Sequence, residues 1–302
     1  MSRVPLIGSQ VPGVHRYMIG SAEVTAVLDG YTDVDTRTIR NADPQKISET
    51  VRAHFLPENG TLRGSINAFI VNTGSELILI DAGGQNHFGP TVGRLMTNIS
   101  HAGYRAEQFD RILLTHMHPD HIAGIVDRSG AKAFPNATLH VQDQEWAFWQ
   151  SPEHQAAAGK AMPQYVDIAR AAAAAYSDAT QLFLFGASVA HCLTAIDIAG
   201  HTPGHTGFML EADGAQLFVM GDVVNAAVLQ FAHPEWTVDF DVDPDAAVRS
   251  RKRNLDWAAS ERVMVAGMHF PFPGVGFVEK VKDGYRFVPS AWQHSFDEHK
   301  PS

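Results

Sequence analysis

The sequence predicts an α/β fold in which two sheets pack face to face with helices outside. Apolar, β-branched runs of strand length alternate with helical patterns along the chain. No repeat of fixed period and no Pro/Ser/Gly linker divides the 302 residues. Sheets and helices that each have one apolar face are stable when they bury those faces against one another. We therefore expect a single domain over residues 1–302, with an N-terminal arm at 1–20 and a C-terminal extension at 270–302.

The first half of the chain alternates strands with short helices. Strands are expected where Val, Ile and Phe cluster between turn residues, and helices where apolar residues recur at spacings of three and four. The expected elements are a strand over 23–30, a helix over 44–54 capped by Asp43, a hairpin of 65–72 and 76–80, a helix over 89–102 and a strand over 111–114.

The second half contains a long helical region followed by several strands. Alanine is the best helix former, so the alanine-rich stretch 153–176 predicts a helix rather than a linker. The other expected elements are helices over 122–126, 143–149 and from Pro244 to about Ser260, strands over 137–141, 182–185, 193–198, 206–210, 216–220 and 263–266, and an edge strand over 285–288.

Composition narrows the class of protein. A hydrophobic content of 45% and a charged content of 19% are typical of a globular protein with a sizeable core. The net charge of −10 argues against a nucleic-acid partner, which would need a basic patch. No apolar run reaches the length of a membrane span. The lone Cys192 allows no intrachain disulfide, and the N-terminus lacks a signal-like apolar segment. We expect a cytoplasmic protein, or a periplasmic one if a signal peptide was removed.

The segment Thr115–His121 concentrates metal-binding side chains directly after a short apolar strand. In an extended chain His116 and His118 share one face, and the following proline keeps His118 extended. Asp120 can cap the next helix, which brings Asp120 and His121 in from a second direction. Imidazole and carboxylate suit a zinc ion. An ordinary polar turn is the weaker interpretation, because burying four unpaired polar side chains is costly.

Three later strands also end in glycine-containing turns with a polar residue. Such turns can hold side chains rigidly and still leave open space beside them. Singly, each polar residue would be read as a turn or capping residue, but together with Thr115–His121 they predict one metal site. The turns are Gly200–Thr206 with His201 and His205, Gly221-Asp222, and Gly267-Met268-His269.

The order of these motifs resembles the metallo-β-lactamase superfamily. His116-x-His118-x-Asp120-His121, then His205, Asp222 and His269, matches its motif set over about residues 20–270, and Asp81 in Asp81-Ala82-Gly83 matches its first motif. Within the superfamily the chain is similar to the methyl parathion hydrolase and lactonase branch. The segments that carry this closer similarity are 12–17, 88–91, 200–206 and 239–244.

The resemblance implies an αββα sandwich of two mixed sheets with a dinuclear metal site at one edge, in a protein that forms a homodimer. One ion would be held by His116, His118 and His205, and the other by Asp120, His121 and His269. Asp222 would bridge the two ions together with a hydroxide. The expected ions are zinc, although manganese, cobalt and iron also accept these ligands.

Several side chains are expected around the ligands. Asp81 would orient a ligand imidazole by accepting its second N–H, and His201 is expected in a supporting role. Asp120 would act as a ligand and also as a proton shuttle. Aromatic residues near the motifs are candidates for the substrate pocket: Phe69, Trp146, Phe148 and Trp149.

Two ions about 3.5–4 Å apart can activate a shared hydroxide and polarise a carbonyl or phosphoryl oxygen. We therefore expect a hydrolase of small uncharged lactones or aryl esters, with side activity on phosphotriesters.

Alternative functions are a glyoxalase II-like thioester hydrolase, a mononuclear iron enzyme like the sulfur dioxygenases, and a non-catalytic metal-stabilised ligand-binding protein. The first is disfavoured because only 33 residues follow His269, too few for the additional helical domain of that subfamily. The metal content would distinguish the mononuclear iron enzyme from a dinuclear hydrolase. The intact ligand set argues against a non-catalytic binding protein.

Overall fold

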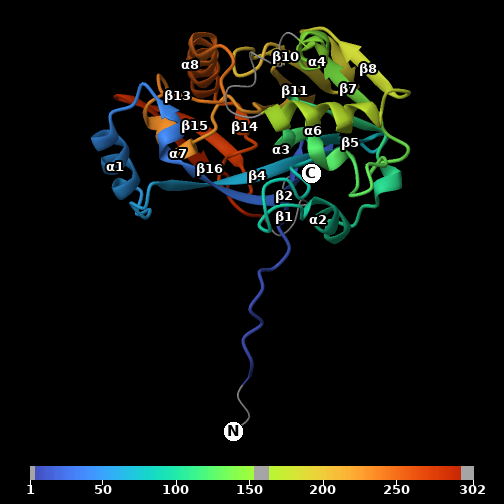
Figure 1. Cartoon of the computed structure of the whole chain (residues 1–302), viewed down its shortest axis with the longest axis horizontal. Helices are drawn as coiled ribbons and strands as arrows, with labels where there is room; N and C mark the ends of the chain where they lie inside the picture. The colour runs from blue at the N-terminus through green and yellow to red at the C-terminus, as the bar shows by residue number, and fades with distance from the viewer. Residues whose placement is uncertain (1–3, 153–162, 294–302) are drawn as a thin grey trace.

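Two seven-stranded sheets form the middle layers of the molecule (Figure 1). The computed structural model describes residues 4–152 and 163–293. The first sheet has the order β1-β2-β4-β5-β6-β7-β8. Neighbouring strands from β1 through β5 pair antiparallel, and neighbouring strands from β5 through β8 pair parallel. Its strands are β1 Val14–Ile19, β2 Ala22–Asp35, β4 Thr61–Asn72, β5 Leu77–Ile80, β6 Arg111–Leu113, β7 Thr138–Gln142 and β8 Thr180–Phe183.

The second sheet has the order β16-β15-β14-β12-β11-β10-β9. Only the β12 and β14 pair is parallel among its pairings. Its strands are β9 Ser188–Ala190, β10 Leu193–Asp197, β11 Thr206–Ala212, β12 Ala215–Val219, β14 Met264–Ala266, β15 Val275–Val281 and β16 Gly284–Pro289. A separate short pair joins β3 Ile39–Arg40 to β13 Thr237–Val238. Both sheets are therefore mixed, as expected.

Helices lie outside the sheets (Figure 1). The α-helices are α1 Pro44–Ala53, α2 Leu95–His101, α3 Pro119–Ile122, α4 Asp143–Gln150, α6 Pro163–Ala174, α7 Ala227–Ala232 and α8 Pro244–Glu261. The 3-10 turns are η1 Thr36–Thr38, η2 Ala106–Gln108 and η3 Ala123–Ile125. The caps expected at Asp43 and Asp243 are present, since their side chains accept from Gln45 and Ala246 N–H.

Alternation along the central strands produces the layers. In β5, Ile78 and Ile80 point into the apolar cluster between the sheets, whereas Leu77 and Leu79 point into the cluster under the helices. In β12, Leu217 and Val219 point into the cluster between the sheets, whereas Phe218 belongs to a separate outer cluster. Each central strand is thus apolar on both faces, as burial on both sides requires.

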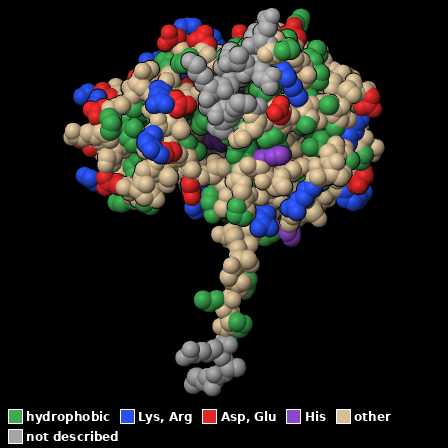
Figure 2. Space-filling view, in the orientation of Figure 1, with side chains coloured by type: hydrophobic (Ala, Val, Ile, Leu, Met, Phe, Trp, Pro, Cys, Tyr) green, Lys and Arg blue, Asp and Glu red, His purple; other side chains and the backbone are tan. Residues whose placement is uncertain are grey.

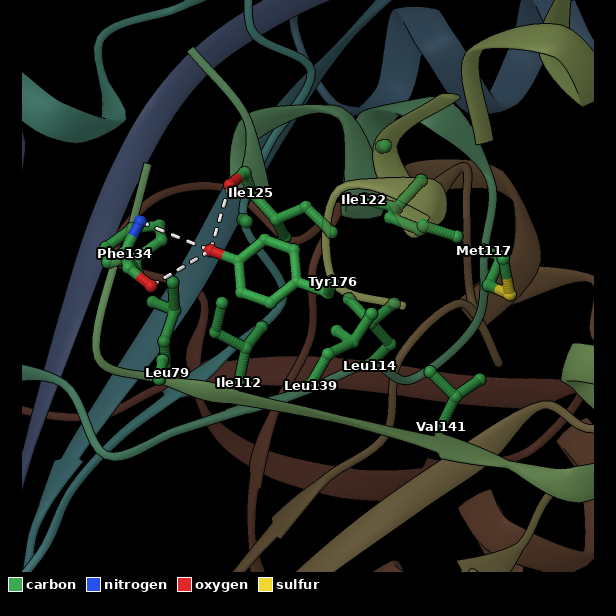
Figure 3. Close-up of a cluster of buried hydrophobic side chains, with 14 of the residues drawn as sticks. Leu79, Ile112, Leu114, Met117, Ile122, Ile125, Phe134, Leu139, Val141 and Tyr176 are labelled. Carbon is green, nitrogen blue, oxygen red and sulfur yellow. Dashed lines mark hydrogen bonds between the residues drawn. The ribbon is translucent and has the colours of Figure 1, made fainter. Parts of the chain in front are cut away.

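Tyr176 shows how the outer layer packs on the first sheet (Figure 3). Its ring lies among Ile112, Leu139 and their neighbours. Its hydroxyl lies 3.1 Å from the carbonyl oxygens of Ile125 and Phe134. The buried alanines of α6 belong to the same cluster, because small side chains let the helix approach the sheet closely.

Several elements differ from the sequence-based expectation. Residues 14–19 form an edge strand rather than part of an arm, and β15 and β16 make the C-terminal extension part of the second sheet. The helix expected over 89–102 begins only at Leu95, because Gly89 and Gly93 have positive φ. The helix expected over 153–176 is observed over α6, and 153–162 lie outside the described residues.

Acidic and basic side chains are interspersed over the face shown in Figure 2, and the described part of the N-terminal arm that precedes β1 projects away from the body. Within the described ranges 4–152 and 163–293, none of the helices combines the length and apolar character needed to cross a bilayer.

Candidate metal centre

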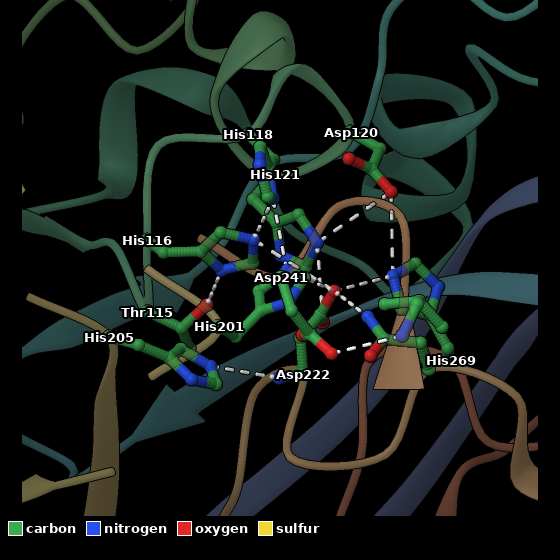
Figure 4. Close-up of polar contacts among 12 residues, drawn as sticks. Thr115, His116, His118, Asp120, His121, His201, His205, Asp222, Asp241 and His269 are labelled. Atoms are coloured by element: carbon green, nitrogen blue, oxygen red, sulfur yellow. Dashed lines mark hydrogen bonds and ion pairs between the residues drawn. The ribbon is translucent and has the colours of Figure 1, made fainter. Parts of the chain in front are cut away.

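Strand ends bring the metal-binding side chains together at one edge of the sandwich (Figure 4). Asp81 directly follows β5, and His116 lies three residues after the end of the parallel neighbour β6. Asp222 and His269 each lie three residues after the ends of β12 and β14, which are parallel neighbours in the second sheet. Parallel strands end at the same sheet edge, so side chains distant in sequence converge there.

Three histidines form the first candidate group, here called the three-histidine group: His116, His118 and His201. His118 Nδ1 lies 2.9 Å from His116 Nε2 and 3.0 Å from His201 Nε2. The backbone of His118 is extended, with φ −61° and ψ 148°, as its position before a proline predicts.

The second candidate group, here called the mixed group, contains Asp120, His121 and His269. Asp120 Oδ2 lies 3.4 Å from His269 Nε2 and 3.7 Å from His121 Nε2. Asp120 and His121 lie in the single turn of α3, where His118 occupies the cap position. The expected side-chain cap by Asp120 is therefore wrong, and its carboxylate faces the imidazoles instead.

Asp222 lies between the two groups. Its Oδ2 is 3.1 Å from His269 Nε2 and 3.5 Å from His201 Nε2, and its Oδ1 is 3.4 Å from His121 Nε2. Asn225 Nδ2 donates to Oδ2 at 2.7 Å. The carboxylate thus faces both groups at once.

Outward hydrogen bonds set the tautomers of the histidines. The Nδ1 atom of His121 lies 2.7 Å from Asp81 Oδ2, that of His201 lies 2.8 Å from Asp241 Oδ1, and that of His269 lies 2.8 Å from the Ser65 carbonyl. These acceptors require Nδ1–H in each imidazole, so each Nε2 directs a lone pair into the site in the neutral form.

His116 follows the same rule through a hydroxyl. Thr115 Oγ1 donates to Asp81 Oδ2 at 2.7 Å and lies 3.1 Å from His116 Nδ1. Because its only proton goes to the carboxylate, the hydroxyl accepts from His116 Nδ1–H. Asp81 therefore supports both His116 and His121, and it does so from a backbone with φ 57°, which is uncommon for a residue other than glycine.

The carboxylates and burial oppose each other in setting pKa values. Burial lowers the pKa of His116 and His118 well below the usual value, so both are neutral near pH 7. Burial acts in the same direction on His121 and His269, but the Asp222 carboxylate outweighs it. The pKa of His121 is raised well above its usual value, and that of His269 is raised to about 9. The site therefore favours positive charge next to its carboxylates.

Divalent cations fit this donor set. His121 Nε2 and Asp222 Oδ1 are buried, face each other and make no hydrogen bond. In the three-histidine group, two Nε2 lone pairs point at His118 Nδ1, and a single proton there could satisfy only one of them. A cation satisfies all of these atoms, and ligands of tetrahedral zinc lie about 3.3 Å apart, close to the separations observed.

His205 was expected as the third ligand beside His116 and His118, but the structure places His201 there. The Nε2 of His205 accepts the backbone N–H of Asp222 at 3.0 Å, so its lone pair is already engaged. His205 is fully buried and positions the Asp222 backbone. The two histidines thus exchange the roles expected from the sequence.

The site opens into a cavity of about 280 Å³ that reaches from the metal centre to an apolar region. Phe88 and Tyr165 lie at the site end, with their rings edge to face at 5.8 Å. Burial and the charge of Asp120 raise the pKa of Tyr165. The apolar lining includes Val34, Ile39, Leu56, Leu62, Ala227, Val228, Val238 and Phe240.

None of the four aromatic residues expected in the pocket lines this cavity. Phe69 is buried between the sheets, and Phe148 and Trp149 are buried under the helices. Trp146 is half-buried and packs against the same cluster under the helices. These aromatics fill the core because their elements face the sheets.

Sequence reasoning gave no role to Asp241, Asn225 or Glu145. Asp241 lies in a segment that carried the family resemblance, but its contact with His201 depends on the tertiary fold. Glu145 had a usable signal, since it is an acidic residue surrounded by aromatic residues on the buried face of a predicted helix.

Comparisons with known proteins agree with this geometry. The family model of the metallo-beta-lactamase superfamily matches residues 61–267. The crystal structure of AbOPH, described as a hydrolase in the beta lactamase superfamily, is 33% identical, with a TM-score of 0.90, and the match covers 94% of this chain and 100% of that one. No curated protein matches the sequence.

Two further solved structures share the fold. AidC, described as a dizinc quorum-quenching lactonase in complex with a product, is 24% identical over 93% of this chain and 99% of that chain, with a TM-score of 0.86. A probable metal-dependent hydrolase from Staphylococcus aureus is 21% identical over 91% of this chain and 100% of that chain, with a TM-score of 0.74.

Fold and site together define a metal-dependent hydrolase. The chain belongs to the metallo-β-lactamase superfamily, as the match over most of its length shows.

Proposed function

We propose that the protein is a dinuclear-metal hydrolase that opens lactones or cleaves aryl esters, with side activity on phosphotriesters. The observation that carries this proposal is that members of both ligand groups line one cavity. His118 and His201 of the first group and Asp120 and His269 of the second line the same cavity, together with Asp222. A substrate in the cavity would therefore meet both groups at once.

The three-histidine group would hold one divalent ion and the mixed group the other, with Asp222 shared between them. Zinc suits the nitrogen-rich donors, and manganese, cobalt and iron also accept them. When bound, such ions supply an activated water nucleophile and polarise a carbonyl or phosphoryl oxygen. AidC, which has the same fold, is a dizinc lactonase.

Asp120 is the residue best placed to handle protons. It lines the cavity, and its Oδ2 faces the two imidazoles of the mixed group. Its Oδ1 would take a proton from the attacking water and return it to the alkoxide that leaves when the ester C–O bond breaks. Addition of one water thus yields an acid and an alcohol, which remain one molecule when the substrate is a lactone.

The cavity favours an uncharged substrate with an apolar portion. Its walls away from the ligands are mostly apolar, and the charged side chains among them are paired. Arg63 forms a bidentate pair with Asp33, and Asp35 pairs with Arg37. Among the described residues that line the cavity, no basic side chain is therefore left unpaired to bind a substrate carboxylate or phosphate.

A substrate panel tests the proposal. Homoserine lactones, aromatic lactones, aryl esters and paraoxon-type triesters would be compared by kcat/KM, with bound metal counted in the same preparation. We expect two ions per chain and the highest kcat/KM on a lactone or ester. Two bound ions with no hydrolysis of any of these substrates would refute it. A single bound iron would instead favour the dioxygenase alternative, and a preference for thioesters the glyoxalase II-like one.

We also propose that the protein is a homodimer. The arm exposes Val4, Leu6 and Ile7, each at least 88% accessible, and Val11 at 74%. Apolar side chains on an extended segment gain free energy when another surface covers them. Sedimentation analysis of the full chain and of a chain lacking residues 1–11 would test this, since the dimer should weaken without the arm.

A further inference from the structure

Glu145 is a buried carboxylate that joins the two loops carrying the three-histidine group. Its Oε1 accepts from Met117 N–H at 2.9 Å, and its Oε2 accepts from Gly204 N–H at 3.0 Å. Met117 lies between two histidines of the group, and Gly204 lies in the loop that carries the third. The indole Nε1–H of Trp149 donates to Oε1 at 2.6 Å. Glu145 itself is 1% exposed.

Only a carboxylate can serve both loops at this position. Both oxygens face N–H donors, and an ionised carboxylate accepts at both, whereas an amide accepts at one and donates at the other. Burial raises the pKa of Glu145, while the N–H donors act in the opposite direction. Burying a carboxylate costs free energy unless hydrogen bonds compensate for the lost water, and these N–H donors provide that compensation.

The loop after β10 also packs directly on the helix that carries Glu145. A Cβ at Gly204 would overlap the backbone of Glu145 and the side-chain oxygen of Gln142. Gln142 Oε1 caps the first turn of α4 by accepting from Gln144 and Glu145 N–H. The first turn of α4 is therefore a fixed support against which both loops rest.

The mixed group depends on other supports. His121 is held by Asp81 and His269 by the Ser65 carbonyl, and neither contact involves α4. The supports of the two groups are thus separable, although Asp81 also orders His116 through Thr115.

We propose that Glu145 is a positioning residue for the three-histidine group, holding the loops of residues 115–118 and 200–206 in their metal-binding arrangement before an ion arrives. The inference rests on the metal-dependent function proposed above, but it concerns ion affinity rather than the identity of the substrate. Glu145 touches neither the cavity nor the reacting atoms.

The test is a zinc titration of metal-free Glu145→Gln against a chromophoric chelator, with the absorption spectrum of the cobalt-substituted protein as a second readout. We expect the affinity for one of the two ions to fall about 10- to 100-fold, the usual effect of changing a residue that orients ligands. The other ion should bind as in the unmodified protein, and the cobalt bands of the weakened site should shift.

Tyr176→Phe is the control for a general loss of stability. Tyr176 is also fully buried, and its hydroxyl accepts from Phe134 N–H and lies 3.1 Å from the Ile125 carbonyl, but neither partner borders a histidine of either group. The Tyr176→Phe protein should bind both ions with unmodified affinity after a comparable loss of thermal stability. Equal zinc affinities and identical cobalt spectra for Glu145→Gln and the unmodified protein would overturn the inference.

Hydrogen exchange on the unmodified, metal-free protein covers the case in which Glu145→Gln does not fold. The Met117 and Gly204 amides should be protected before zinc is added. Rapid exchange that becomes slow only with zinc would show that the ion orders the loops, and would refute the role of Glu145. Both measurements are independent of hydrolysis, so a failure of the substrate panel would leave this inference intact.

Discussion

His201 Nε2 lies 3.0 Å from His118 Nδ1, although 83 residues separate the two in sequence. Asp241 holds the opposite nitrogen of His201, so the imidazole is oriented before any ion binds. His205, four residues later, uses its Nε2 to accept the Asp222 backbone N–H. The hydrogen-bond partner of each ring therefore distinguishes the candidate ligand from the supporting residue.

His201→Ala and His205→Ala should accordingly have different effects. Loss of His201 should remove one ion and lower kcat/KM at least 100-fold, because it deletes a donor of the three-histidine group. Loss of His205 should leave both ions bound and destabilise the fold by about 1–3 kcal/mol, the cost of an unsatisfied buried N–H. Metal analysis and thermal unfolding would measure both effects. Loss of an ion from the His205 variant alone would restore the assignment expected from the sequence.

Asp81→Asn should weaken ion binding without removing a ligand. An amide retains one acceptor oxygen, but Asp81 accepts three hydrogen bonds, from His121 and twice from Thr115. We expect about a 10- to 100-fold loss of zinc affinity, greatest for the mixed group. Chelator competition would measure it. Asp241→Asn is the comparison, because Asp241 holds His201 and its loss should weaken the ion of the three-histidine group. If each variant weakened both ions equally, the two groups would not have separate supports.

Sequence patterns predicted the sandwich and the segments that meet at its edge, because both depend on local features. The ligands of Thr115–His121 lie in one segment, and Asp222 and His269 follow apolar strands whose pairing sets their position. The choice between His201 and His205 could not be made in this way, since both flank the same glycine turn. Phe69 likewise is an aromatic residue of the kind that often lines pockets, and only the packing of the two sheets shows that it belongs to the core.

Narrowing the apolar end of the cavity should change substrate preference without changing metal content. Ala227 lines the cavity at the start of α7 and belongs to neither ligand group. In Ala227→Trp the larger ring should fill that end, raising KM for lactones with long or aromatic substituents at least tenfold while small lactones are little affected. Steady-state kinetics would measure the ratio.

Phe69→Leu serves as the control for that change. Phe69 is fully buried between the sheets, so this variant should lose stability but keep the preference among substrates. A shift in preference from Phe69→Leu as large as that from Ala227→Trp would show that general loosening, rather than the cavity wall, sets specificity.

His140 should make the fold sensitive to mild acid independently of the metal centre. It is 4% exposed in β7, with Thr138 Oγ1 2.8 Å from its Nε2, and burial followed by the Arg111 charge lowers its pKa to about 4. The unfolded chain protonates this residue near its ordinary pKa of 6.5, so between these values the unfolded state binds more protons. Stability from this group is therefore complete above about pH 6.5 and is lost as the pH falls toward 4. The loss between pH 7 and pH 5 is about 2 kcal/mol.

Urea unfolding of the unmodified protein and of His140→Gln, both with chelator present, should show their stabilities converging by about that amount as the pH is lowered. Parallel stability curves would refute the role of His140.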